Sequence, residues 1–197
     1  MNHQNKIALV TGGSRGLGRA IALQLARSGA DIILTYRERR DEAAAVVTEI
    51  GKLGRRAALV QLDVAHTAGF AAFADALRQS LADGWERTSF NFLVNNAGID
   101  SAGPFAEFTE ENFDRLMNVH FKGVFFLTQR LLPLLADGGR IVNTSTGLAR
   151  FAIPGYAAYA SMKGARSPHT LPRQGARLPP DHGQRRRARH HRDRFHP

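Results

Sequence analysis

Lys6-Ile-Ala-Leu-Val-Thr-Gly-Gly-Ser-Arg-Gly-Leu-Gly18 is a short apolar run that leads directly into a glycine-rich turn. The run is rich in β-forming residues and predicts a buried strand over residues 6–11. Helical periodicity follows over residues 19–28 and stops at Gly29. In such a unit the glycines let the backbone come close to a pyrophosphate, which the helix N-terminus attracts. The stretch therefore predicts the first unit of a dinucleotide-binding α/β fold rather than an ordinary glycine-rich turn.

The rest of the chain repeats this alternation of strand and helix. Apolar runs predict further strands over residues 31–36, 57–62, 90–94 and 140–143. Helical patterns lie between them, over residues 41–53, 67–82 and 109 to about 139, with Pro133 bending the last one. The loop of residues 84–89 carries Trp85, which we expect to cap a surface. The predicted architecture is a Rossmann-type, doubly wound parallel sheet in a single α/β domain.

Composition separates the body of the chain from its end. Residues 1–165 hold 18 Lys and Arg against 15 Asp and Glu, a net charge of +3, whereas residues 166–197 hold 9 Arg and 2 Asp, a net charge of +7. The absence of Cys and of an apolar leader favours a cytoplasmic protein. The most apolar stretch, residues 124–136, is too short to cross a membrane, and Gln129 and Arg130 interrupt it. We expect no metal site.

The end of the second strand predicts which nicotinamide cofactor is bound. An acidic residue there would accept a hydrogen bond from the 2′-hydroxyl of NAD, but this chain has Tyr36 and Arg37. Arg15 adds a second cation in the glycine loop. Cations suit a 2′-phosphate, so the sequence favours NADP(H), with NAD(H) as the alternative. Arg39 and Arg40 are better explained as the solvated start of a helix.

Polar and small residues follow the later strands. Asp63-Val64 follows the third strand, Asn95-Asn-Ala-Gly98 the fourth, and Thr144-Ser-Thr146 the fifth. In a parallel sheet the carboxyl ends of the strands meet at one edge, where ligands bind. These segments and the glycine loop are therefore expected to line one site.

Tyr159 and Lys163 are spaced to act together. Residues at i and i+4 share one face of a helix, so the phenol and the ammonium point into the same space. A neighbouring cation favours phenolate and lowers the pKa of a tyrosine from about 10. The pair is therefore a candidate general acid and base near neutral pH.

The long helix predicted after residue 109 contains two polar residues in an apolar setting. Asn118 would be unfavourable there unless its amide were hydrogen-bonded. It is either a structural amide or a site residue that holds a water molecule. His120 is expected to be a partly exposed helix residue rather than an acid or base.

These motifs, in this order and spacing, resemble the short-chain dehydrogenase/reductase family over residues 6 to about 165. The narrower resemblance is to 3-oxoacyl-(acyl-carrier-protein) reductases. The motifs are Thr11-Gly-x-x-x-Gly-x-Gly18, Asp63-Val64, Asn95-Asn-Ala-Gly98, Asn118, the Ser/Thr strand end, and Tyr159-x-x-x-Lys163.

The resemblance implies an oxidoreductase that interconverts a carbonyl compound and a secondary alcohol by hydride transfer. Tyr159 would exchange a proton with the substrate oxygen, Lys163 would assist it and hold the nicotinamide ribose, and Asn118 would order a water. The hydroxyl thirteen residues before the tyrosine is that of Thr146, which we assign to orienting the substrate, with Ser145 as the alternative. The expected cofactor-binding residues are Gly12, Ser14, Arg15, Gly16, Leu17, Gly18, Tyr36, Arg37, Asp63, Val64, Asn95, Ala97, Gly98, Tyr159 and Lys163.

After residue 165 the chain departs from the family pattern. Pro168 and Pro172 would break the helix, and residues 166–197 contain no Val or Ile, so the C-terminal strands of the family are missing. Taken as written, this basic, Pro- and Arg-rich tail is expected to be disordered. Reading each codon one nucleotide later permits EVLTRYLAKELGYRRITVNVVAPG, a helix followed by a strand. We therefore hypothesise a shifted reading frame, which incompatible codons in the gene would contradict.

Three functions are compatible with these features. The leading one is an NADP(H)-dependent oxidoreductase acting on a small molecule, whose truncated form is expected to be marginally stable and poorly active. The second is a nucleotide-binding remnant without catalysis. The third, binding of nucleic acid by the Arg-rich tail, is disfavoured because Phe195 is the tail's one aromatic residue. The full-length form is expected to be a homo-oligomer, either a dimer or a tetramer, as in the family.

Overall fold

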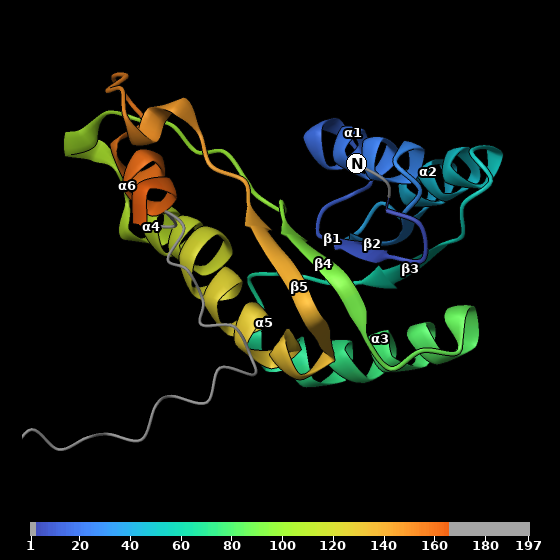
Figure 1. Cartoon of the computed structure of the whole chain (residues 1–197). Coiled ribbons are helices and arrows are strands. Elements are labelled where there is room, and N and C mark those ends of the chain that lie inside the picture. Colours follow the sequence, from blue (N-terminus) through green and yellow to red (C-terminus); the bar gives the residue numbers. More distant parts are fainter. Residues whose placement is uncertain (1–2, 166–197) are drawn as a thin grey trace, which may run out of the picture.

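The structure is a computed structural model that describes residues 3–165 (Figure 1). The predicted basic tail and its shifted-frame hypothesis concern residues 166–197, which lie outside the described residues. Within residues 3–165, no helix is long and apolar enough to span a bilayer.

Five parallel strands form the sheet, in the spatial order β3-β2-β1-β4-β5. The strands are β1 Ile7–Val10, β2 Asp31–Tyr36, β3 Ala57–Gln61, β4 Phe90–Asn95 and β5 Leu135–Asn143. The chain runs outward from β1 to β3 and then returns to place β4 on the other side of β1. This reversal opens a crevice between the carboxyl ends of β1 and β4. The predicted Rossmann-type sheet is confirmed.

Helices cover both faces of the sheet, as a doubly wound fold requires (Figure 1). Alternate residues of β1 serve the two faces: Ile7 and Leu9 belong to the core under α3 and α5, and Ala8 and Val10 to the core under α1 and α2. The helices are α1 Gly16–Arg27, α2 Arg40–Lys52, α3 Phe70–Trp85, α4 Glu110–Met117, α5 Gly123–Leu131 and α6 Ala157–Ala165.

The helix predicted from residue 109 to about 139 is confirmed as helical only to Leu134, and it is not a single α-helix. Thr109 caps its start as expected, accepting a hydrogen bond from the Asn112 backbone, but α4 passes into a π-helical turn, Asn118–Lys122, before α5 begins. After α5 the chain forms the 3₁₀ turn Leu132–Leu134, which contains Pro133. β5 then starts at Leu135, five residues earlier than predicted, with a register irregularity opposite Phe90 and Phe92.

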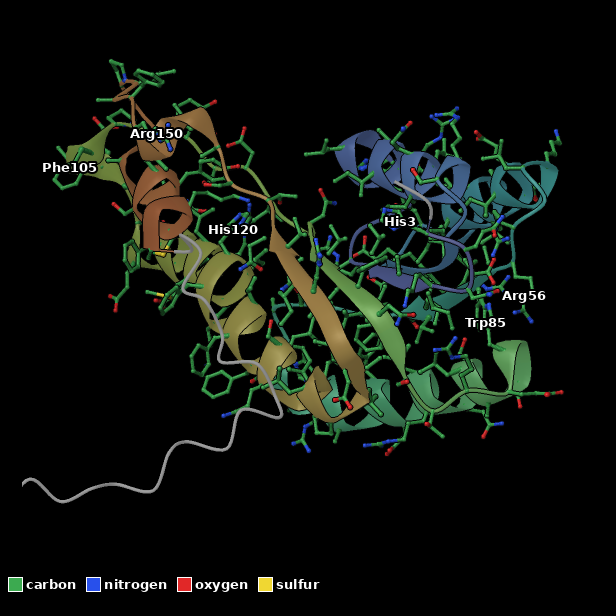
Figure 2. All side chains as sticks on the ribbon, viewed as in Figure 1. His3, Arg56, Trp85, Phe105, His120 and Arg150 are labelled. Atoms are coloured by element: carbon green, nitrogen blue, oxygen red, sulfur yellow. The ribbon has the colours of Figure 1, made fainter. Side chains whose placement is uncertain are left out.

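Trp85 is not the surface residue of a loop, as the sequence suggested. It ends helix α3, is 7% exposed, and donates a hydrogen bond of 2.8 Å from its indole Nε1 to Asp31. Asp31, at the start of β2, also accepts from the Arg56 backbone and pairs with Arg55 at 2.6 Å. Figure 2 shows Trp85 beside Arg56, whose guanidinium lies 5.5 Å from the indole ring. This cluster ties α3 to the amino-terminal edge of the sheet.

The Asp31 cluster predicts an acid-sensitive contribution to stability. Burial alone would raise the pKa of the Asp31 carboxyl, but hydrogen bonds from Arg56 and Trp85, with the charges of Arg55 and Arg56, hold that pKa below its ordinary value. A depressed pKa means that the stabilisation is complete above the unfolded-state pKa and is lost as pH falls through the folded-state pKa.

We expect Asp31→Asn to lower the free energy of unfolding by about 2 kcal/mol near pH 7, because it removes a buried charge from its partners. The difference from the unmodified chain should shrink as the pH falls below 3.8. Urea denaturation at several pH values measures it. Glu49→Gln, which breaks the exposed pair with Arg19, is the control and should change stability by less than about 0.5 kcal/mol. A pH-independent effect of Asp31→Asn would contradict the assignment.

Candidate active site

A cavity of about 500 Å³ lies at the carboxyl ends of the strands. Its size falls within the range that small-molecule and cofactor sites occupy, about 300–1,000 Å³. Nearly every residue that the sequence placed in a cofactor site lines it. The predicted cofactor residues at its wall are Gly12, Ser14, Arg15, Gly16, Leu17, Gly18, Tyr36, Arg37, Asp63, Val64, Ala97, Gly98, Tyr159 and Lys163.

The glycine loop has no room for side chains where it turns into α1. A Cβ on Gly18 would overlap the carbonyl oxygen of Gly12 and lie 2.5 Å from the Asn96 amide nitrogen. Gly12 has a φ of +65°, and a Cβ there would come within 2.9 Å of the Ala97 backbone. Helix α1 starts at Gly16, inside the loop, so its first backbone N–H groups are presented at the cavity. This arrangement suits an anionic pyrophosphate.

Asn96 holds the loop in place. Its side-chain amide donates to the carbonyl oxygens of Thr11 and Gly12 at 3.0 and 3.2 Å. In return the Thr11 hydroxyl accepts from the backbone N–H groups of Asn96 and Ala97 at 2.9 and 3.0 Å. The carboxyl ends of β1 and β4 are thereby joined through four hydrogen bonds.

Asn95 does not line the cavity, although the sequence placed it among the cofactor residues. It is 1% exposed, and its amide donates to the Thr128 hydroxyl at 3.1 Å and to the Asn143 side chain at 2.9 Å. Strand alternation explains the difference, because neighbouring residues at the end of β4 point to opposite sides. Asn95 joins β4, β5 and α5, and Asn96 faces the glycine loop.

Cationic side chains gather at the end of β2. Arg15, Arg37 and Arg39 line the cavity there together with Glu38. Arg37 is exposed and pairs with Glu38 at 2.9 Å, an interaction that solvent weakens. In the loop after the neighbouring strand β3, Asp63 accepts a hydrogen bond from the Ala65 backbone, which orients its carboxylate at the cavity wall.

Tyr159 and Lys163 occupy the opposite end of the cavity, on helix α6. Lys163 is 4% exposed; its Nζ donates to the Thr144 carbonyl at 3.4 Å and lies 5.6 Å from the centroid of the Tyr159 ring. The predicted helical juxtaposition of the two side chains is present. A buried ammonium beside a phenol stabilises the phenolate form, as proton transfer requires.

The three hydroxyl residues after β5, Thr144, Ser145 and Thr146, do not all face the cavity. Thr144 and Ser145 line the cavity, and the Ser145 hydroxyl donates to the Lys163 carbonyl at 3.5 Å. The Thr146 hydroxyl instead accepts from the Leu148 backbone at 3.3 Å and caps the 3₁₀ turn Gly147–Ala149. The structure therefore brings the alternative, Ser145, to the cavity wall and does not bring Thr146 there.

His120 is completely buried, contrary to the exposed position expected from the sequence. Its ring lies edge-on to that of Tyr159, with the ring centroids 5.3 Å apart. Asn118 is half-buried and is not among the residues that line the cavity. The burial of His120 could have been predicted from the sequence. A spacing of three to four residues places it on the buried face of the helix with Leu116, Gly123 and Leu127.

Comparison with known proteins identifies the family. The family model described as short chain dehydrogenase matches residues 6–170. The chain belongs to this family. Among relatives, a tetrahydroxynaphthalene reductase, PfmaG, of Pestalotiopsis fici is 37% identical over 162 residues, covering 81% of this chain and 56% of the relative. A hydroxynaphthalene reductase-like protein, Arp2, of Metarhizium brunneum is 38% identical, with 81% and 58% covered. This short-chain dehydrogenase thus spans somewhat more than half the length of these relatives.

Solved structures share the same architecture. The landomycin C-6 ketoreductase LanV, with bound NADP and rabelomycin, is 42% identical with a TM-score of 0.81, covering 84% of this chain and 67% of that one. A short chain dehydrogenase from Burkholderia cenocepacia in complex with NADP is 40% identical with a TM-score of 0.76, covering 84% and 66%.

The glycine loop yields a direct prediction. Gly18→Ala should weaken NADPH binding at least about tenfold, because the added methyl group pushes the Gly12 carbonyl and the Asn96 side chain away from residue 18 and distorts the glycine loop. The quenching or enhancement of NADPH fluorescence on titration measures the affinity. Gly51→Ala in helix α2 is the matched control, since a Cβ there meets nothing within 4 Å and should stabilise the helix by about 0.5–1 kcal/mol. Equal NADPH affinity in the two variants would show that the close approach does not matter.

Proposed function

We propose that this chain is an NADP(H)-dependent oxidoreductase that interconverts a ketone and a secondary alcohol. The observation that carries the proposal is that Tyr159 and the buried Lys163 face the same cavity that the glycine loop lines. NADP is bound in both of the solved structures named above. When bound, the nicotinamide supplies or accepts the hydride, and the protein supplies orientation and a proton path.

The cavity fits this cofactor at both ends. The first backbone N–H groups of α1, at Gly16, Leu17 and Gly18 in the cavity wall, would bind the pyrophosphate. Arg15 and Arg37 at the end of β2 would hold a 2′-phosphate, and Asp63 and Val64 would flank the adenine end. Lys163 would hold the nicotinamide ribose near Tyr159.

Proton transfer falls to Tyr159. Its phenol would exchange a proton with the substrate oxygen, and the ammonium of Lys163 would stabilise the charge that develops on the phenol. The proposed orienting hydroxyl is that of Thr146, on the basis of its thirteen-residue spacing from Tyr159. The alternative is Ser145, which lines the cavity. Asn118 remains the proposed holder of a relay water.

We further propose an apolar, ring-bearing carbonyl compound as the substrate. The relatives named above include a tetrahydroxynaphthalene reductase, a hydroxynaphthalene reductase-like protein and a ketoreductase with rabelomycin bound. In this chain, Phe151 and Ile153 are 70% and 52% exposed on the loop that precedes α6. The narrower resemblance to 3-oxoacyl-(acyl-carrier-protein) reductases, the cytoplasmic location and the homo-oligomeric state remain predictions.

Cofactor choice is tested at the end of β2. Arg37→Ala should weaken NADPH binding about tenfold and leave NADH binding nearly unchanged, because only NADPH carries the 2′-phosphate. Arg40→Ala, at the start of α2 and outside the cavity lining, is the matched control. Equal losses for NADPH and NADH in Arg37→Ala would contradict the assignment.

Catalysis is tested at Tyr159. Tyr159→Phe should reduce single-turnover hydride transfer from NADPH to a bicyclic aromatic ketone by at least about 10²-fold, with NADPH affinity within about threefold of the unmodified chain. The decay of nicotinamide absorbance measures the transfer. Tyr156→Phe, which removes a hydroxyl one helical turn earlier, should retain the rate. Absence of transfer in the unmodified chain, with NADPH bound, would favour the nucleotide-binding remnant.

A further inference from the structure

His120 lies at an unusual place in the helical segment after α4. It belongs to the π-helical turn Asn118–Lys122, and its side chain is 0% exposed. The residue after the turn packs closely on a distant segment: a Cβ on Gly123 would collide with the Val64 carbonyl oxygen and lie 2.6 Å from that of Asn118. The extra residue of a π-turn rotates the following side chains relative to an α-helix, and such turns are frequent at functional sites. Figure 2 shows His120 between this helical segment and the sheet.

One end of the imidazole contacts the chain that leaves β4. Nε2 lies 2.7 Å from the Ile99 carbonyl oxygen and 3.3 Å from the Ile99 backbone nitrogen. Nε2 hydrogen-bonds the Ile99 backbone in either tautomer: protonated it donates to the carbonyl oxygen, and unprotonated it accepts from the backbone N–H. Cε1 lies against Gly98, where an added Cβ would be only 2.8 Å away. Gly98 and Ile99 both line the cavity, so His120 fixes part of its wall.

The flank of the same ring contacts Tyr159. The two rings are edge-on at 85°, with centroids 5.3 Å apart, a favourable arrangement for aromatic pairs. The ring of Tyr156 contacts that of Tyr159 from another direction, with the ring centroids 6.2 Å apart. The Lys163 Nζ lies 5.6 Å from the centroid of the Tyr159 ring. Tyr159 is thus held between its own helix and the π-turn.

We infer that His120 is a positioning residue with two tasks. Its Nε2 anchors Ile99 in the wall of the cavity, and its ring sets the orientation of the Tyr159 side chain. The two tasks use different parts of the imidazole, so they can be separated by substitution. The importance of Tyr159 rests on the proposed function, but the contacts of His120 do not.

Three substitutions separate the tasks. His120→Gln keeps a donor near the position of Nε2 and loses the ring. His120→Phe keeps an aromatic ring and loses the donor. His120→Leu loses both while keeping the site apolar. The anchoring task is read by NADPH affinity from fluorescence titration. The orientation task is read by NMR of ¹³C-labelled tyrosine in a Tyr36→Phe/Tyr156→Phe background, where Tyr159 is the only tyrosine left of the three in the chain.

We expect NADPH affinity to fall about tenfold in His120→Phe and His120→Leu and to stay within about threefold of the unmodified value in His120→Gln. The Tyr159 resonance should move toward that of free tyrosine in His120→Gln and His120→Leu and move little in His120→Phe. Unmodified NADPH affinity in both His120→Phe and His120→Leu would overturn the anchoring task. An unmoved resonance in both His120→Gln and His120→Leu would overturn the orientation task.

Two further variants guard against a general loss of structure. Leu127→Ala removes a side chain that is 1% exposed on α5; it should lower stability without moving the Tyr159 resonance. Gly98→Ala displaces the imidazole without removing it and should move the resonance as His120→Leu does. A resonance that moves equally in Leu127→Ala would show that the effect is not specific to His120. Because the NMR readout needs no turnover, an absence of hydride transfer would contradict the proposed function and leave this inference standing.

Discussion

The close approach of two backbones governs this structure. Where β1 turns into α1, the glycine loop lies so near to the end of β4 that a Cβ at Gly12 would come within 2.9 Å of the Ala97 backbone, and Asn96 and Thr11 join the two segments. Because the loop and the strand end are held together, the first turn of α1 is aimed at the crevice where the strand order reverses. The position of the cavity, and therefore of everything that lines it, follows from this junction.

Local sequence patterns were sufficient to predict the sheet and most of the residues that line the cavity. Short apolar runs bounded by glycines and acids identify the strands, because a buried parallel strand is apolar on both faces. Residues at the carboxyl ends of those strands meet at one edge whatever the details of packing, which is why the glycine loop, Asp63 and Gly98 could be placed together from sequence. The i, i+4 spacing placed Tyr159 beside Lys163 in the same way.

The features that sequence reasoning missed depend on distant contacts. The π-turn in the long helix lies next to Gly123, which packs on the Val64 carbonyl, a partner nearly sixty residues away in the chain. Trp85 extends α3 because its indole reaches Asp31 on another strand. Asn95 and Asn96 look equivalent as letters, but strand geometry sends them to different neighbours. The burial of His120 was readable from helical spacing, and its contacts with Ile99 and Tyr159 were not.

The junction between Thr11 and Asn96 also affects the order in which parts of the chain can fold during synthesis. Its hydrogen bonds join residues 85 positions apart in the chain. A ribosome that has delivered β1, α1 and β2 has made the glycine loop but not the strand that holds it. Pairings of such long sequence separation form late, after local structure. A nascent chain therefore carries the glycine loop before its anchor on β4 exists, and its first half depends on its own apolar core until β4 is synthesised.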